Sequence, residues 1–161
     1  MKIGVISDTH DNIPQVEKAL KVFVESGVEQ VIHAGDMVSP FLDKCFTDLK
    51  VPLLYLIGNN EGEIAWIYKR FTRIGEVHPG PVMKDLGGKK VYVNHIPHFV
   101  DSLAKSGDFD IIIYGHTHKI DVRTVGGTLI VNPGECCGYL TGKSTIAIID
   151  TEKMSADVVE L

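Results

Sequence analysis

Side chains able to bind divalent metal ions recur along the chain in short clusters. Carboxylate and amide oxygens mixed with imidazole nitrogens suit ions such as Mn, Fe, Ni, Co or Zn, and no thiolate belongs to the set. If the fold brings the clusters together, the chain has a metal site. The clusters are Asp8-Thr9-His10, Gly35-Asp36, Gly58-Asn59-Asn60, Asn94-His95 and Gly115-His116-Thr117-His118.

The number of these ligands indicates more than one ion. Two-residue spacing along an extended backbone puts Asp8 and His10 on the same side of the chain, and His116 and His118 repeat that spacing. Together the clusters offer more ligands than one ion needs. Two ions roughly 3.5–4 Å apart, sharing a bridging carboxylate, would use all of them. We therefore expect two divalent metal ions as cofactors.

Predicted β-strands position the clusters, because each cluster comes just after a short apolar run. Such runs are typical of buried strands. Laid side by side, the strands would deliver every cluster to one edge of a sheet. The runs are residues 3–6, 31–32, 53–57, 91–93 and 111–114.

The first half of the chain alternates these strands with predicted helices. Asn12 is a candidate N-cap with Pro14 in the first turn, and Gly27 ends this helix. Its predicted apolar face is Ile13, Val16, Leu20, Phe23 and Val24. Ser39-Pro40 predicts a second helix start, followed by the stripe Phe41, Leu42, Cys45, Phe46 and Leu49. A third helix around residues 64–71 is expected to form one wall of a substrate pocket, while the size of Trp66 favours a place in the core.

The pattern of the second half of the chain predicts β-hairpins. Gly87-Gly88 and Gly126-Gly127 each lie between β-like runs, and residues 145–149 and 156–159 flank a polar turn. Parallel strand–helix units followed by antiparallel hairpins indicate an α/β fold with mixed sheets and helices outside. In such folds, the connections at the strand carboxyl ends usually build the functional site.

Composition fits a compact enzyme. The 161 residues agree with one domain on a prior of about 150 residues per domain. With 44% hydrophobic residues and a net charge of −5, the chain is neither disordered nor basic enough for a nonspecific nucleic-acid binder. We expect no signal segment and no membrane span. Cys45, Cys136 and Cys137 make a poor disulfide set, so we expect a reducing cytoplasm and packing roles for the thiols.

The order D-x-H, G-D, G-N-N, H and G-H-x-H resembles the calcineurin-like metallophosphoesterase superfamily, specifically its small single-domain phosphodiesterases from archaea and bacteria. Asn132-Pro133-Gly134 followed by Glu135 to Gly138 is similar to archaeal members. The resemblance covers nearly the whole chain and implies one metallophosphoesterase domain over residues 1–161. It implies a four-layer α-β-β-α sandwich of two mixed sheets flanked by helices, with the metals at the strand carboxyl ends.

The resemblance also implies a ligand set and a reaction. The first ion would be held by Asp8, His10, Asp36 and His118, and the second by Asp36, Asn59, His95 and His116. Asp36 is then the bridge. A hydroxide shared by the ions would attack phosphorus in a small or aryl phosphodiester. Manganese is the expected metal, with nickel, cobalt, iron and zinc as alternatives.

Two positions depart from the family pattern. Asn60 stands where larger members carry a His that assists the leaving oxygen, and an amide has no proton to give. We hypothesise that Asn60 binds a phosphate oxygen only, which favours acidic leaving groups. His95-Ile96-Pro97-His98 replaces the usual His-Gly-His, and His98 is a candidate substitute proton donor. His33 and His78 are expected to lie outside the site.

The sequence also allows other functions. The same centre could serve a phosphomonoesterase or a nuclease. A non-catalytic protein-interaction scaffold is a further alternative, as in the retromer subunit that resembles these enzymes. The complete ligand set favours the enzyme with a small-molecule substrate, without a membrane or extended nucleic acid as partner. The sequence leaves homo-oligomer formation open.

Overall fold

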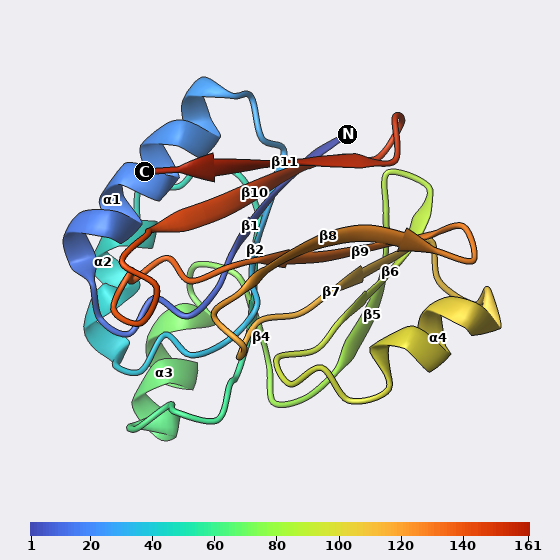
Figure 1. The fold of residues 1–161 in the computed structure, drawn as a ribbon. Helices are drawn as coiled ribbons and strands as arrows, with labels where there is room; N and C mark the ends of the chain where they lie inside the picture. Colours follow the sequence, from blue (N-terminus) through green and yellow to red (C-terminus); the bar gives the residue numbers. More distant parts are fainter.

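Two β-sheets face each other, with helices on both outer sides (Figure 1). The computed structural model describes residues 1–161. The six-stranded sheet has the order β11 (Ser155–Glu160), β10 (Thr145–Asp150), β1 (Lys2–Ile6), β2 (Gln30–His33), β3 (Leu53–Leu56) and β4 (Glu76–His78). The five-stranded sheet has the order β5 (Val82–Leu86), β6 (Lys89–Val93), β7 (Ile111–Ile113), β9 (Thr128–Pro133) and β8 (Ile120–Val125).

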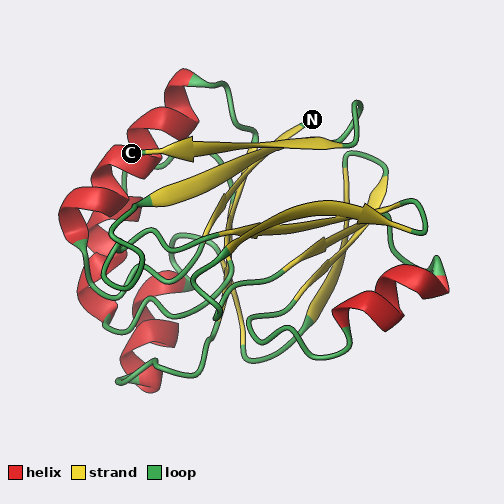
Figure 2. Cartoon of the chain, in the orientation of Figure 1, coloured by secondary structure: helices red, strands yellow, loops and turns green.

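The helices complete a four-layer arrangement (Figure 2). Three α-helices and a 3-10 turn lie against the six-stranded sheet, and α4 lies against the other sheet. This confirms the expected α-β-β-α sandwich. The elements are α1 (Ile13–Glu25), the 3-10 turn η1 (Pro40–Leu42), α2 (Asp43–Phe46), α3 (Ile64–Phe71) and α4 (Val100–Ser106). No helix has the length and apolar character needed to cross a bilayer.

Both sheets are mixed, as expected from the order of elements. Strands β1 to β4 run parallel, and β10 and β11 add an antiparallel pair at one side. In the second sheet β6, β7 and β9 are parallel. The predicted hairpins are present, because Gly87-Gly88 joins β5 to β6 and Gly126-Gly127 joins β8 to β9 with positive φ angles that suit glycine.

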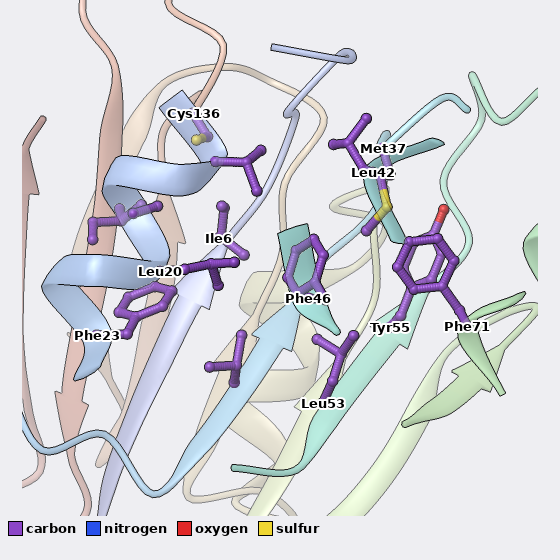
Figure 3. Packing of buried hydrophobic residues seen from close by; sticks show 14 of the residues in the cluster. Ile6, Leu20, Phe23, Met37, Leu42, Phe46, Leu53, Tyr55, Phe71 and Cys136 are labelled. Atoms are coloured by element: carbon purple, nitrogen blue, oxygen red, sulfur yellow. The ribbon is translucent and has the colours of Figure 1, made fainter. Parts of the chain in front are cut away.

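Separate apolar cores join the layers. Aromatic and aliphatic side chains from α1, α2 and α3 pack on the outer face of the six-stranded sheet, where Figure 3 shows Phe23, Phe46, Tyr55 and Phe71. A second core of mainly β-branched and leucine side chains fills the space between the sheets. Burying a phenylalanine side chain stabilises the fold by about 1.5–3 kcal/mol. These cores therefore hold the ends of the central strands in fixed positions.

The structure corrects the expectation of a single sheet edge. The motif strands β1, β2 and β3 belong to the six-stranded sheet, whereas β6 and β7 belong to the five-stranded sheet. The clusters converge because both sheets present the carboxyl ends of their parallel strands at the same end of the sandwich. Strand periodicity alone does not say which strands pair, so the sequence could not divide them between sheets.

Several apolar residues assigned to helix faces are exposed instead. Ile13 and Val24, near the two ends of α1, are 41% and 68% exposed. The helix after Ser39 is only a 3-10 turn and one short α-helix, so Phe41 remains 62% exposed. Trp66 is 48% exposed, against the expectation of a core position, because α3 buries Ile67 and Phe71 on its inner face.

Candidate metal centre

Nearly all of the predicted ligands meet in two groups at the strand ends. The nitrogen and oxygen ligand atoms of Asp8, His10 and His118 lie within 4.8 Å of one another, and those of Asp36, His95 and His116 do the same. Each group combines residues that follow strands of both sheets. The remaining predicted ligand, Asn59, is exposed in the loop after β3. The structure thus brings together residues more than a hundred positions apart in the sequence.

Asp36, a member of the second group, also faces a ligand of the first. Its Oδ1 is 3.2 Å from Nε2 of His95, and its Oδ2 is 3.8 Å from Nε2 of His10. Within the first group, Oδ1 of Asp8 is 3.4 Å from Nε2 of His118. One carboxylate therefore faces ligands of both groups, which is the placement that a bridging ligand needs.

Several of these atoms have no protein partner. Asp8 Oδ1, His10 Nε2 and His95 Nε2 are buried and make no hydrogen bond. Buried polar atoms are normally paired, so a cluster of unpaired acceptors calls for an ion. The mixture of carboxylate oxygens and imidazole nitrogens fits divalent transition metals. The residues present therefore fit the metal ions that the sequence predicts.

Hydrogen bonds at Nδ1 fix the tautomer of two imidazole rings, those of His95 and His118. His95 Nδ1 lies 2.8 Å from the carbonyl oxygen of Ala34, and His118 Nδ1 lies 2.7 Å from Oε2 of Glu135. A carbonyl oxygen and an ionised carboxylate can only accept, so each Nδ1 carries the proton. The lone pair on each Nε2 is then free for an ion.

The backbone at the centre is unusual. Asp8, His10, Asp36, His116 and His118 all have positive φ angles, between 39° and 66°. Only a small left-handed region is open to such residues, and departures of this kind cluster at functional sites. Gly35 and Gly58 let neighbouring chains come close, because an added Cβ would collide with the His95 ring and with Asp36 respectively. The motif glycines therefore have a packing role.

The two central carboxyl groups have opposite pKa shifts. Burial dominates at Asp8 and raises its pKa above the ordinary value. Burial also acts to raise the pKa of Asp36, but His95 beside it and two hydrogen bonds donated by Asn60 hold this pKa below its usual range. Asp36 is thus ionised throughout the neutral range, ready to bind cations.

Comparison with known proteins identifies the family. A model of the calcineurin-like phosphoesterase superfamily domain matches residues 1–154. The chain belongs to this family. It is 42% identical to phosphodiesterase MJ0936 of Methanocaldococcus jannaschii over 95% of each chain. A solved structure of an archaeal phosphodiesterase superposes with a TM-score of 0.94 at 39% identity, covering 100% of both chains.

A relative of another kind is also present. Vacuolar protein sorting-associated protein 29 of Schizosaccharomyces pombe is 27% identical, over 96% of this chain and 80% of that protein. This metallophosphoesterase is thus also similar to a protein that is named for a role in sorting.

The two departures from the family pattern occupy different places in this metallophosphoesterase. Asn60 lies beside Asp36: its backbone N–H donates to Oδ1 at 2.9 Å and its Nδ2 donates to Oδ2 at 2.7 Å. His98 is exposed in the turn after β6, where its ring lies 6.3 Å from that of Phe99. It belongs to neither group of ligands.

Glu135 is a buried residue of this metallophosphoesterase whose role the sequence reasoning missed. Besides His118, its carboxylate accepts hydrogen bonds from the Leu140 N–H at 3.0 Å and from the Thr141 hydroxyl at 2.6 Å. Burial opposes ionisation, but these donors lower the pKa of Glu135 to about 2. The similarity of residues 132–138 to archaeal members was the one signal that marked this segment.

His33 lies outside the ligand groups, as does His78, which pairs with Glu76 on β4. His33 is nonetheless fully buried beneath the centre. The Gly35 N–H donates to its Nδ1 at 3.2 Å, so its Nε2 carries the proton and donates to Thr9 Oγ1 at 3.0 Å. Burial lowers the pKa of His33 to about 3. A neutral histidine thus ties the D-x-H loop to the G-D loop.

The cysteines are free thiols. Cys136 is buried in the core beside the helices, in line with its expected packing role. Cys137 is also buried, and its Sγ donates to Glu135 Oε2 at 3.1 Å. This thiol therefore touches the carboxylate that orients His118, and the ligand atoms of Cys137, Glu135 and His118 lie within 4.8 Å of one another.

Proposed function

We propose that this protein is a metal-dependent phosphodiesterase that holds two divalent ions and acts on a small or aryl phosphodiester. The observation that carries the proposal is the pair of ligand groups joined by Asp36. The first ion would bind Asp8, His10, Asp36 and His118, and the second would bind Asp36, Asn59, His95 and His116. Residues 1–161 would act as one domain.

The bound ions and the protein residues would then have separate roles in the reaction. Bound ions supply a water that is deprotonated near neutral pH and take up charge on the phosphate oxygens. The protein positions this chemistry: Asn60 fixes the carboxylate of Asp36, and Glu135 orients His118. Asn60 has no acidic proton for the leaving oxygen. The enzyme should therefore prefer esters whose leaving groups are stable as anions.

A named relative supports the proposed substrate class, and the ligand chemistry supports the proposed metal. The relative from Methanocaldococcus jannaschii is named a phosphodiesterase, which supports a diester over a monoester. Oxygen and nitrogen ligands suit manganese, and they accept nickel, cobalt, iron or zinc as well. We propose manganese as the activating metal.

The alternative is a non-catalytic scaffold, favoured by the similarity to the yeast sorting protein. A scaffold has no need of buried ligand atoms that lack protein partners, and burying a polar group without a partner costs free energy. Those atoms at Asp8, His10 and His95 support the enzyme instead.

Hydrolysis of model esters tests the proposal. Bis-p-nitrophenyl phosphate and p-nitrophenyl phosphate are compared with added Mn²⁺ and with chelator, for the wild type, Asp36→Ala and the exposed control Asp157→Ala. We expect metal-dependent turnover of the diester in the wild type and the control, and none in Asp36→Ala. A folded wild type that hydrolyses neither ester with any divalent ion would favour the scaffold.

A further inference from the structure

Asn132 is a fully buried polar residue near the end of strand β9. Its side-chain amide reaches the G-H-T-H loop of residues 115–118. The Nδ2 group donates two hydrogen bonds, one to the Gly115 carbonyl at 2.9 Å and one to Thr117 Oγ1 at 3.0 Å. These acceptors belong to the residues directly before and directly after His116. Asn132 therefore holds the chain on both sides of this predicted metal ligand.

The partners of the Asn132 amide determine its orientation. A carbonyl oxygen can only accept, so the group that faces Gly115 is the NH2. On the other side, Oδ1 accepts a hydrogen bond from the Gly134 N–H at 2.9 Å, and a backbone N–H can only donate. Rotation of the amide by half a turn would break three hydrogen bonds. The side chain is therefore held in a single orientation.

The segment that Asn132 holds is a tight turn. The Thr117 N–H donates to the Gly115 carbonyl at 2.7 Å, which closes a three-residue turn around His116. The φ angle of His116 is 66°. A three-residue hydrogen-bonded turn with a positive φ at its centre is the rare and strained form of the γ-turn. Strained backbone persists only where surrounding contacts over-determine it, and the two hydrogen bonds from Asn132 are such contacts.

The backbone has a large part in placing the His116 ring. The His95 and His118 rings are each fixed by a hydrogen bond at Nδ1. His116 is an exposed residue, and its bond to the metal centre is made by its backbone N–H, which donates to Asp8 Oδ2 at 3.0 Å. The turn sets the direction of the Cα–Cβ bond and thereby the place of the imidazole.

We propose that Asn132 is a positioning residue for the second metal site, because its amide holds the turn that aims His116 at the ion. This inference rests on the proposed function, in which His116 binds that ion. Glu135, three residues further along the chain, holds the ring of His118 in the first group. Residues 132–135 would then position one ligand of each ion through separate side chains.

Mn²⁺ titration of one site at a time tests the assignment. The His10→Ala protein keeps the second ligand group intact, and the His95→Ala protein keeps the first. In the His10→Ala protein, adding Asn132→Asp should weaken Mn²⁺ binding about 10–100-fold, because an oxygen replaces the Nδ2 donor at constant size. In the His95→Ala protein the loss should be much smaller, since Glu135 holds His118 independently. Equal losses at both sites, or no loss at the second, would overturn the proposal.

Thr117 provides a second variant, at an exposed position where substitution keeps the fold. In the His10→Ala protein, Thr117→Val removes one acceptor of the Asn132 amide and should weaken Mn²⁺ binding about fivefold, the effect of one neutral hydrogen bond. Thr117→Ser keeps the hydroxyl and should bind as the parent protein does. So should the matched control Thr124→Val, at an exposed threonine on β8. Equal affinity in Thr117→Val and Thr117→Ser would count against the proposal.

Amide hydrogen exchange gives a readout that needs neither bound metal nor turnover. The N–H groups of Gly115 and His116 are hydrogen-bonded, to the His95 carbonyl and to Asp8 respectively. In the chelator-treated protein, Thr117→Val should exchange faster than Thr117→Ser at these two positions, because the loop opens more easily. Exchange in the central strands should be the same in both variants. Equal exchange at the two loop positions would show that the amide does not hold the turn.

These measurements separate failure of this inference from failure of the proposed function. If the wild type hydrolyses no diester or binds a single ion, the proposed function fails, and the exchange result still decides whether Asn132 holds the turn. If the wild type binds two ions and hydrolyses the diester, but the Asn132 and Thr117 variants bind both ions as tightly, the phosphodiesterase stands and this inference fails.

Discussion

Asn60 binds both oxygens of Asp36, one through its backbone N–H at 2.9 Å and one through its side-chain amide at 2.7 Å. The loop that follows β3 thereby holds the carboxylate that faces both ligand groups. The residue that replaces the family's histidine is thus a donor to Asp36. It has hydrogen-bond donors but no acidic proton.

The rate of hydrolysis should depend strongly on the leaving group. Without a general acid at position 60, the rate should fall steeply as the leaving group becomes more basic. The check is a series of phosphodiesters in which the second ester is constant and the leaving alcohol or phenol varies in pKa. Similar rates for alkyl and aryl leaving groups would show that another residue supplies the proton.

His98 is the candidate for such a proton donor. Because it is exposed and belongs to neither ligand group, His98→Ala should leave the affinity for Mn²⁺ unchanged. If His98 donates a proton, the variant should lose activity mainly on esters with basic leaving groups, and little on p-nitrophenyl esters. Weaker metal binding in His98→Ala would place this residue among the ligands, against the structure.

Glu135 should affect the metal centre through His118. Glu135→Gln removes the charged acceptor of the His118 Nδ1 proton, and loss of such a partner typically weakens metal binding about 10–100-fold. Titration of the chelator-treated protein with Mn²⁺ measures the change. The matched control is Glu160→Gln, an exposed residue on β11. Equal affinity in Glu135→Gln and wild type would mean that the ring is positioned by other contacts.

His33 predicts a pH dependence of stability. The unfolded chain binds a proton on this histidine near its ordinary pKa of 6.5, whereas the folded protein does so only near 3. Between these values the unfolded state holds the extra proton, so stability present above pH 6.5 is lost as the pH falls. The loss approaches about 1.4 kcal/mol per pH unit for one proton.

Urea unfolding in the presence of chelator, from pH 7.5 to pH 5, tests this linkage. His33→Gln cannot titrate, so its free energy of unfolding should fall less steeply with decreasing pH than that of the wild type. The comparison uses the slopes, because the substitution itself also changes the absolute stability. Parallel slopes would show that His33 is not held neutral.

Much of the site could be predicted from the sequence because its residues stand next to recognisable strand patterns. Asp8, Asp36 and His116 each follow a short apolar strand, and strand carboxyl ends are where such folds place ligands. The hairpins at Gly87-Gly88 and Gly126-Gly127 were predictable for a similar reason, since the turn residues themselves adopt the required positive φ angles.

The remaining features depend on tertiary contacts. Glu135 meets His118 only because the hairpin of β8 and β9 folds the intervening chain back on itself. Trp66 was expected in the core by its size, but the inner face of α3 is already filled by Ile67 and Phe71. Local periodicity also does not show which strands pair. It could not predict that β1 to β3 lie in one sheet and β6 and β7 in the other.

The central claim is that two ions share Asp36, and the number of ions bound per chain tests it most directly. Mn²⁺ binding is measured by equilibrium dialysis on the chelator-treated wild type, His10→Ala and His95→Ala, which alter one ligand group each. The account predicts two ions per chain in the wild type and loss or marked weakening of one in each variant. A single ion in the wild type, or two undiminished sites in both variants, would contradict it.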